Sequence, residues 1–219
     1  MSPTAVTASS RRRASQSAMV ARRRAAARRR RRRVAFGLGL AGLMVVGIVL
    51  ALPLAKRAVN DLGLPLQYPA VIRREAAAKR LDPALVAAVI YAETKFDART
   101  SPAGAVGLMQ LMPETATYLA HRSGATTFTT ADLSTPQVNI AYGSYYLRYL
   151  LNEFHGNTVE ALAAYNGGEA NVHHWIAESG ARRLAIADIG FPETRDYVQR
   201  VLQARTEYRR RYAAQLGYG

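Results

Sequence analysis

The sequence predicts an all-α (mainly α) fold, in which a helical domain follows one N-terminal transmembrane helix. Three observations predict it: an uninterrupted apolar stretch near the N-terminus, apolar residues that recur at helical spacing from residue 68 onward, and prolines or capping residues where that spacing begins. No sustained alternation of apolar and polar residues indicates a strand, and there is no internal repeat. With 219 residues the chain accommodates one ordinary domain and an appendage.

The first 55 residues combine a positively charged tail with the apolar stretch. Residues 1–33 hold twelve arginines and no acid, whereas the rest of the chain holds 18 Lys and Arg against 15 Asp and Glu. Residues 34–55 carry no charge, and at helical rise they span about 33 Å, close to the thickness of a bilayer core. Because cytoplasmic flanks are enriched in Lys and Arg, we expect a single-pass anchor in the cell (inner) membrane, with the N-terminus inside and the domain extracytoplasmic.

Two other interpretations of this region compete with an anchor. The apolar stretch could be a secretory signal peptide cleaved after Val49-Leu50-Ala51, although its length favours retention. The arginine run could bind nucleic acid, but no aromatic residue interrupts residues 1–33 and no recognition helix accompanies them. We expect a solvated tail that sets the topology and touches anionic lipid headgroups, with no specific nucleic-acid partner.

The remaining residues are expected to form a linker and one helical domain. Residues 56–66 are the expected linker, because Gly63 and Pro65 interrupt a continued helix, and residues 67–215 are the expected domain. Asp82 before Pro83 is a strong helix start, an N-cap followed by proline at the first helical position. We expect about seven helices, over residues 68–81, 84–95, 113–119, 136–154, 158–166, 172–177 and from 192 onward.

The composition excludes several kinds of active site. The chain has no cysteine, which excludes disulfides, thiol nucleophiles and cysteine metal ligands. His173 and His174 are adjacent, so on a helix they point about 100° apart and cannot chelate one ion together. No His-Glu-x-x-His pattern, dinucleotide-binding glycine loop or nucleophile-elbow serine is present. We therefore expect neither a metal nor a cofactor.

Glu93 is the strongest catalytic candidate. It lies near the end of helix 84–95, three residues after Ile90 and four after Val89, so it borders the apolar stripe of that helix. The loop that follows, 101–113, is largely apolar and contains two glycines. Apolar surroundings raise the pKa of a carboxyl group. A Glu that stays protonated at neutral pH is what acid-assisted cleavage of a glycosidic bond requires.

Five motifs, the first of which contains Glu93, follow one another along the chain. They are Ala-Glu-Thr-Lys-Phe-Asp at 92–97, Ser-Pro-Ala-Gly-Ala-Val-Gly-Leu-Met-Gln-Leu-Met-Pro at 101–113, Asn-Ile-Ala at 139–141 with Gly143, Ala-Ala-Tyr-Asn-Gly-Gly at 163–168 and Pro-Glu-Thr-Arg-Asp-Tyr-Val at 192–198. In this order the motifs resemble the soluble lytic transglycosylase (SLT) family, which has a lysozyme-like catalytic domain, over about two thirds of the chain. The sequence departs from the family pattern in three ways: Thr94 replaces the usual Ser, the stretch from Glu93 to Ser101 is one residue shorter than the commonest form, and Glu169 stands where the family often has Pro.

The resemblance implies that Glu93 is the single catalytic residue, acting first as an acid and then as a base. It also implies a saccharide-binding groove formed by Ser101, Gly107, Met109, Gln110, Tyr165, Asn166, Glu193 and Tyr197. Plainer roles compete for three of these residues: Tyr165 as a core aromatic, Met109 as a core filler and Glu193 as an acid that interacts with a helix dipole.

The sequence offers Glu93 no obvious carboxylate partner, although most glycosidases use a pair of carboxylates. Asp97 is the nearest acid, and its place at a helix end favours a solvated or capping role. The attacking oxygen must then come from the substrate, and the C6 hydroxyl of N-acetylmuramic acid can supply it.

We therefore predict a peptidoglycan lytic transglycosylase that cleaves the β-1,4 bond between N-acetylmuramic acid and N-acetylglucosamine and leaves a 1,6-anhydromuramoyl end. Its partners would be peptidoglycan glycan strands and, through residues 34–55, the membrane. Three alternatives are a hydrolytic muramidase of the same fold, a non-catalytic glycan-binding scaffold subunit and a membrane-tethered nucleic-acid binder.

Overall fold

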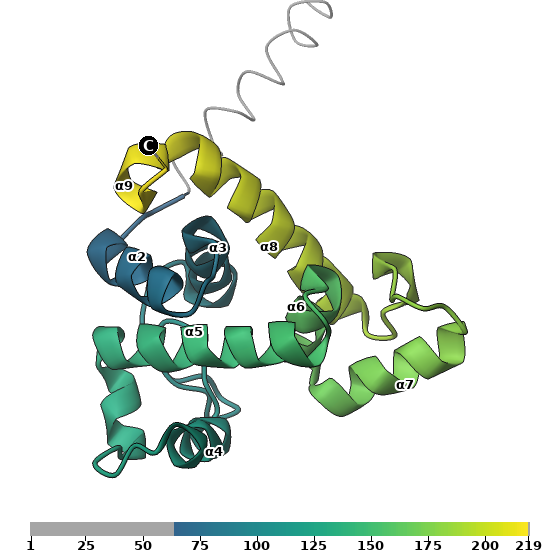
Figure 1. Cartoon of the computed structure of the whole chain (residues 1–219), viewed down its shortest axis with the longest axis horizontal. Helices are drawn as coiled ribbons and strands as arrows, with labels where there is room; N and C mark the ends of the chain where they lie inside the picture. Colours follow the sequence, from purple (N-terminus) through teal and green to yellow (C-terminus); the bar gives the residue numbers. More distant parts are fainter. Residues whose placement is uncertain (1–63, 219) are drawn as a thin grey trace, which may run out of the picture. The chain divides into compact units, whose positions relative to one another are not determined.

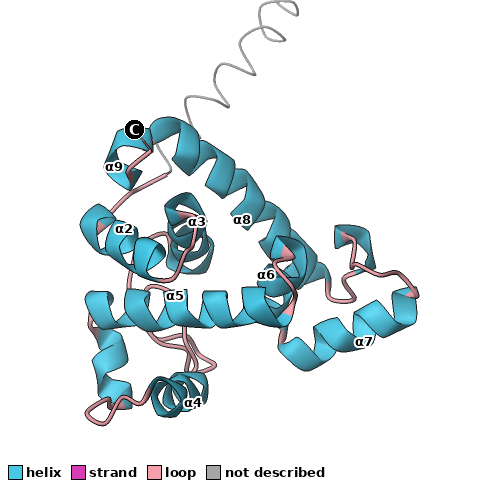
Figure 2. Ribbon diagram, in the orientation of Figure 1, coloured by secondary structure: helices cyan, strands magenta, loops and turns pink. Residues whose placement is uncertain are grey.

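Proline begins five of the helices in the computed structural model, which describes residues 64–218. Its fixed φ suits the first helical position, where an N–H has no partner in any case. These residues confirm the mainly α prediction, with helices joined by loops (Figures 1 and 2). The α-helices are α2 (Pro69–Ala78), α3 (Pro83–Thr94), α4 (Pro113–Ser123), α5 (Pro136–Glu153), α6 (Thr158–Gly167), α7 (Glu169–Ser179), α8 (Pro192–Arg211) and α9 (Ala213–Leu216), with short 3₁₀ turns η1 (Thr130–Ser134) and η2 (Ile186–Asp188).

Six of the seven predicted helix starts agree with the structure to within one residue, but α7 begins at Glu169 and not at 172. The Asp82 side chain caps α3 by accepting a hydrogen bond of 3.0 Å from the backbone N–H of Ala84. The Asn157 side chain caps α6 in the same way, 3.0 Å from the N–H of Val159. The ends are less accurate: α4 continues to Ser123, and the single turn of α9 was not predicted.

Helix α3 is the centre of the hydrophobic core. Every residue in the range 84–90 is buried, so the helix is apolar all round rather than along one predicted stripe. A helix of this kind needs neighbours on several sides. It has them in α2 and α8, and α8 packs along it most extensively (Figure 1).

The second half of the domain surrounds α6. This alanine-rich helix packs against α5, α7 and α8, and residues 160–164 are all buried. A smaller apolar cluster, formed by Leu111, Ala116 and Leu133, joins the loop before α4 to η1. These contacts bring the C-terminal end of α3, the loop 95–112, α6 and the start of α8 into one region.

The first described residues are bound to the C-terminal part of the domain. The Tyr212 hydroxyl donates to the carbonyl of Leu64 at 2.7 Å, and the Tyr208 hydroxyl donates to the carbonyl of Pro65 at 2.6 Å. The Leu64 side chain is buried in the main core. Residues 64 and 65 are therefore fixed beside the end of α8.

The predicted transmembrane helix at 34–55 lies outside the described residues, and the proposed boundaries at 33, 55 and 66 stay predictions. Residues Leu62–Gly219 form one compact unit. Between residues 64 and 218, none of the helices combines the length and the apolar character that crossing a bilayer requires.

Candidate active site

Glu93 lies on the last turn of α3, and the chain reverses sharply just after it. Lys95 and Phe96 both adopt left-handed backbone conformations, with φ of 53° and 66°. Such conformations are uncommon for residues other than glycine, and tertiary contacts must hold them. Phe96 supplies such contacts, because its side chain is buried and packs near the Tyr208 ring.

Thr94 ties the end of α3 to the loop that follows. Its hydroxyl is buried and lies 3.2 Å from the carbonyl of Ile90 and 2.8 Å from the carbonyl of Leu108. The Arg99 guanidinium also donates to the backbone carbonyl of Glu93, at 3.4 Å. These hydrogen bonds connect the backbone around Glu93 to the preceding turn of α3 and to the loop that follows.

The Glu93 side chain is half-buried, and its surroundings raise the pKa of its carboxyl group from 4.5 to about 7. Burial is the largest cause, because it removes water from the charged form. The Tyr197 hydroxyl and the Arg200 guanidinium act in the opposite direction and lower this pKa. The expectation that apolar surroundings raise the pKa of Glu93 is confirmed.

Two tyrosines, from α6 and α8, lie beside the Glu93 carboxyl group. Burial raises the pKa of both Tyr165 and Tyr197 well above 10, and the charge of Glu93 raises both further. The Tyr165 hydroxyl donates to the carbonyl of Met109 at 2.9 Å, and its ring packs 5.2 Å from the Tyr146 ring. The Tyr197 hydroxyl is buried and forms no hydrogen bond of normal geometry with any residue in 64–218, so it faces Glu93 without being fixed elsewhere.

Ser101 and Gln110 hold the loop in shape through their side chains. The Ser101 hydroxyl accepts from the N–H of Ala105 at 3.0 Å. The Gln110 side-chain amide donates to the carbonyls of Arg99 and Gly107, each at 2.8 Å. Both residues are half-buried, and in this structure their side-chain bonds are made within the loop.

Gly107 is required by the local geometry. Its φ is 79°, and a Cβ atom there would overlap the Asn139 amide and lie 2.6 Å from the carbonyl oxygen of Leu133. Met109 is completely buried, with its side chain against Gly143, where an added Cβ would overlap it. The Met109 side chain therefore belongs to the core in this structure, and its backbone carbonyl supports Tyr165.

Asn139, on α5, connects the loop to the rest of the domain. It is fully buried, and its side chain accepts from the N–H of Met109 at 2.8 Å. It also donates to the carbonyls of Val106 and Leu133, at 2.8 and 3.0 Å. One side chain thus satisfies three backbone groups that would otherwise be unpaired in the interior.

We expect Asn139→Ala to lower the free energy of unfolding by about 3 kcal/mol, because it leaves those three buried backbone groups without partners. Chemical denaturation of residues 62–219 would measure the change. The matched control is Asn152→Ala, an exposed position on the same helix, for which we expect a change within about 0.5 kcal/mol. Equal losses in the two variants would contradict this role for Asn139.

Asn166 and Glu193 occupy exposed positions near the end of α6 and the start of α8. The Asn166 side-chain oxygen accepts from the Thr194 hydroxyl at 2.7 Å, and Thr194 is completely buried. This bond fixes the amide so that its NH₂ group is the end that can donate to a ligand. Glu193 stands in the first turn of α8, and Tyr197, one turn later, is the residue that reaches Glu93.

Asp97 and the two adjacent histidines are not among the groups that shift the pKa of Glu93. Asp97 is exposed and lies 3.8 Å from the Arg99 guanidinium. His173 pairs with Glu153, whereas its neighbour His174 pairs with a different acid, which agrees with the predicted divergence of the two rings. Within residues 64–218 no group of three or more His, Asp or Glu gathers in a way that could hold a metal ion.

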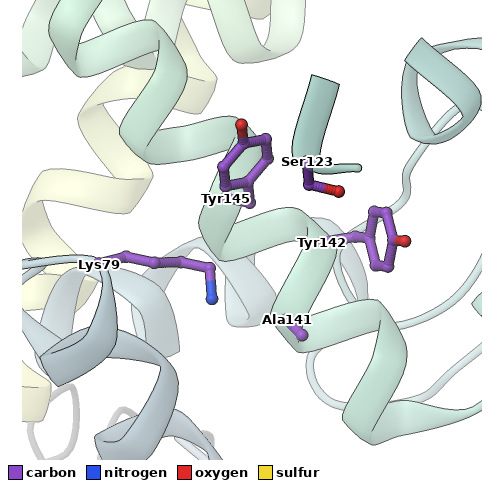
Figure 3. A pocket seen from close by; sticks show the side chains of 5 residues that line it. All are labelled: Lys79, Ser123, Ala141, Tyr142 and Tyr145. Carbon is purple, nitrogen blue, oxygen red and sulfur yellow. The ribbon is translucent and has the colours of Figure 1, made fainter. Parts of the chain in front are cut away.

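A separate pocket of about 170 Å³ lies over α5 (Figure 3). It is lined by Lys79, Ser123, Ala141, Tyr142 and Tyr145. The Lys79 ammonium is bonded to Glu75 at 2.7 Å, and the Tyr142 ring packs 4.4 Å from the Phe128 ring. This pocket shares no lining residue with the Glu93 cluster, and we assign it no role.

Sequence reasoning did not find the supporting threonines. The sequence marks Thr94 only as a departure from the family pattern, and Thr194 only as a member of the motif at 192–198. Both are hydroxyl residues that stand among apolar helix positions, and both are completely or almost completely buried. A polar side chain at a core-facing position is the signal that would have found them, because a buried hydroxyl needs a hydrogen-bond partner.

Comparison with known proteins identifies relatives over the helical domain. The family model described as Transglycosylase SLT domain matches residues 70–186. The soluble lytic murein transglycosylase of Escherichia coli K12 is 35% identical over 150 residues, covering 66% of this chain and 23% of that protein. The transglycosylase of Enterobacteria phage PRD1 is 40% identical over 115 residues, covering 52% of this chain and 39% of that protein.

Solved structures agree with the sequence relatives. The lytic transglycosylase Slt of Pseudomonas aeruginosa, solved as an inactive Glu-to-Gln mutant, has a TM-score of 0.64 and 37% identity, covering 69% of this chain and 25% of that one. The 70 kDa soluble lytic transglycosylase of Escherichia coli also has a TM-score of 0.64, with 34% identity over 67% of this chain and 25% of that one. This chain thus spans about a quarter of the length of these relatives.

Proposed function

The chain belongs to the SLT-domain transglycosylase family, and from this premise we propose that it is a peptidoglycan lytic transglycosylase with Glu93 as its catalytic residue. The observation that carries the proposal is a half-buried carboxyl group whose pKa is raised to about 7, flanked by the hydroxyl groups of the partly buried Tyr165 and the buried Tyr197. The inactive Glu-to-Gln mutant of the Pseudomonas relative supports a mechanism that depends on one glutamate.

In the first step the protonated Glu93 carboxyl group donates its proton to the oxygen between N-acetylmuramic acid and N-acetylglucosamine. The bond from that oxygen to the muramic C1 breaks, and N-acetylglucosamine leaves as a neutral alcohol. Positive charge develops at C1 and the ring oxygen, beside the newly formed carboxylate. A pKa of about 7 suits this step, because the acid form is well populated near neutral pH.

In the second step the C6 hydroxyl oxygen of the same muramic acid residue attacks C1. A 1,6-anhydro bond forms, and the hydroxyl proton passes to the Glu93 carboxylate, which restores the acid. The attack is intramolecular, so no second carboxylate is needed to activate water. Asp97, exposed and beside Arg99, is not placed to serve as one.

Asn166 is proposed to steady the charged intermediate. The Thr194 hydroxyl occupies its carbonyl oxygen, so its NH₂ group is free to donate to a sugar oxygen or to the acetamido group. The Tyr197 hydroxyl is proposed to donate to the Glu93 carboxylate after proton transfer, because it faces that group and lowers its pKa. Ser101, Gly107 and Gln110 are proposed to form the wall that shapes the groove, and the buried Met109 is proposed to support that wall from behind through its backbone carbonyl.

We also propose that residues 34–55 anchor the protein in the cell membrane, with the catalytic domain on the wall-facing side. The 22 uncharged residues and the arginines before them support this arrangement. The substrate supports it too, because peptidoglycan lies outside the cytoplasmic membrane.

Analysis of the products tests the proposed reaction. Purified sacculi digested with residues 62–219 should release muropeptides that end in 1,6-anhydromuramic acid, which mass spectrometry recognises because they are lighter by one water than hydrolysed products. Reducing muramic ends in place of anhydro ends would favour a hydrolytic muramidase. Binding to sacculi with no release of either product would favour the non-catalytic scaffold subunit.

A further inference from the structure

The last turns of α8 carry a cluster of arginines. Arg205, Thr206, Arg209 and Arg210 line a surface pocket of about 400 Å³, which we call the basic patch. The described part of the chain as a whole is almost balanced, with 16 Lys and Arg against 14 Asp and Glu. The positive charge at this end of α8 is therefore a local feature.

All three guanidinium groups of the basic patch are held in place by neighbours, and that of Arg210 lies 2.7 Å from the Glu207 carboxylate. Arg205 donates to the Asp82 carboxylate at 2.6 Å. The Arg209 guanidinium lies 4.8 Å from the centre of the Tyr218 ring, a cation–π contact that restrains its position and leaves its charge uncompensated by that partner. A surface whose cations are already positioned loses less conformational freedom when it binds an anion.

The patch lies at the end of the domain where its first described residues are fixed. Tyr208 and Tyr212, which bind the carbonyls of Pro65 and Leu64, belong to the same end of α8 as the arginines. Figure 1 shows this end of α8 together with α9. Arg73 of α2 adds a further cation, since it donates to the carbonyl of Gln215 in α9 at 2.8 Å.

The length of chain before Leu64 limits how far this end can lie from a bilayer. Only eight residues, 56–63, separate the uncharged stretch 34–55 from Leu64. Fully extended, eight residues span at most about 28 Å. If residues 34–55 cross the membrane, Leu64 stays within about 28 Å of the end of that span, so the arginines at this end of α8 can reach the lipid surface.

We propose that the basic patch binds the anionic headgroups of the membrane that holds residues 34–55, and so fixes the orientation of the catalytic domain. This inference rests on the membrane anchoring proposed above. Residues 56–63 alone would keep the domain near the membrane without orienting it. Their maximum length of about 28 Å exceeds the distance of about 8 Å over which charges act at physiological ionic strength. Contact between the arginines and the lipid phosphates supplies the orientation.

The proposed orientation places the active site at a set distance from the lipid. Tyr197, beside Glu93, and Arg210 lie on the same helix, thirteen residues apart. At 1.5 Å per residue they are about 20 Å apart along α8. With the patch on the headgroups, α8 separates the lipid contact from the site that would receive glycan strands.

Vesicle binding of residues 62–219 tests the proposal without the N-terminal arginines. This fragment is one compact unit whose core is drawn from residues within 64–216, so it is expected to fold on its own. At about 0.15 M salt it should co-sediment with vesicles of one part phosphatidylglycerol to two parts phosphatidylcholine, and not with pure phosphatidylcholine. Binding should be lost at about 1 M salt, where charges are screened within about 3 Å.

The matched variants carry the same change of charge at two places. Arg209→Ala with Arg210→Ala should weaken binding to the anionic vesicles by about twenty-fold or more, since each basic residue near a lipid surface contributes about five-fold. Arg182→Ala with Arg183→Ala, in the exposed segment after α7, should change it by less than about two-fold. Equal weakening by the two pairs, or equal binding to both kinds of vesicle, would overturn the proposal.

Two further measurements separate the possible failures. Inorganic phosphate, at the same phosphorus concentration as the vesicles, should not raise the melting temperature of the fragment. A higher melting temperature in phosphate, together with no binding to the vesicles, would mean that the patch is a phosphate site and would refute the membrane proposal. Digestion of purified sacculi, which contain no membrane, should be unchanged in Arg209→Ala with Arg210→Ala. Loss of lytic activity in the unaltered fragment would refute the proposed function, whereas loss of vesicle binding alone would refute only the patch.

Discussion

Glu93→Gln is expected to reduce the release of 1,6-anhydromuropeptides from purified sacculi by about 10³-fold or more. The substitution keeps the size and the hydrogen-bonding shape of the protonated side chain but removes the proton that the first step transfers and the base that the second step needs. General acid–base groups typically contribute about 10² to 10⁴ in rate, and here one residue does both tasks. Rates from chromatography of the soluble products, with residues 62–219 as the enzyme, measure the effect.

The control for this variant is Asp97→Asn, which removes an exposed carboxylate three residues beyond the end of α3. We expect its rate to stay within about two-fold of the unaltered domain, as for a surface substitution away from the site. Binding of Glu93→Gln to sacculi should also be retained. Full turnover by Glu93→Gln would exclude Glu93 as the acid.

The same substitution should stabilise the fold in alkaline solution. Glu93 has a pKa of about 7 in the folded chain against 4.5 when unperturbed. Below about pH 4.5 it is protonated in both states, so Glu93→Gln and the unaltered domain differ little. As the pH rises from about 4.5 to about 7, Glu93 ionises in the unfolded chain but stays protonated in the folded domain, so the unaltered domain loses stability that the Gln variant keeps, and the loss is complete above about pH 7.

The difference should reach about 2 to 3 kcal/mol above about pH 8, from the pKa difference at 1.36 kcal/mol per unit, reduced because the side chain is only half-buried. Denaturant unfolding of both domains at about pH 4 and about pH 8 measures it. Asp97→Asn, which alters an exposed acid, should show no comparable gain. Parallel stability curves for Glu93→Gln and the unaltered domain would mean that the folded environment does not oppose ionisation of Glu93.

The sequence predicted the local features of the site but not the contacts between residues that are far apart along the chain. Asp82 with Pro83 determines where α3 begins, because capping and the fixed φ of proline act within a few residues. Only the family resemblance predicts that Tyr165 and Tyr197 belong to the same groove as Glu93, since each lies more than seventy residues away along the chain. Hydrophobic spacing places residues on a face of a helix, but it does not say which helix that face will meet.

The loop after α3 shows the same limit more sharply. Its glycines suggested a turn, yet the need for Gly107 comes from the Asn139 amide and the Leu133 carbonyl, which belong to distant segments. The bond from Thr94 to the Leu108 carbonyl likewise depends on how the loop returns over α3. Tertiary contacts of this kind decide the geometry of the site, whereas local preference decides only which elements are available.

The bonds from Tyr208 and Tyr212 to the carbonyls of Pro65 and Leu64 determine where the domain can be cut from whatever precedes it. Cleavage by a protease, or a designed truncation, that removes only residues before 62 leaves the carbonyls of Leu64 and Pro65 and the buried Leu64 side chain in place. Trimming beyond Pro65 removes both acceptors and uncovers apolar surface next to α8. A domain that keeps Leu64 and Pro65 therefore retains these contacts with α8, whereas a domain that begins after Pro65 loses them.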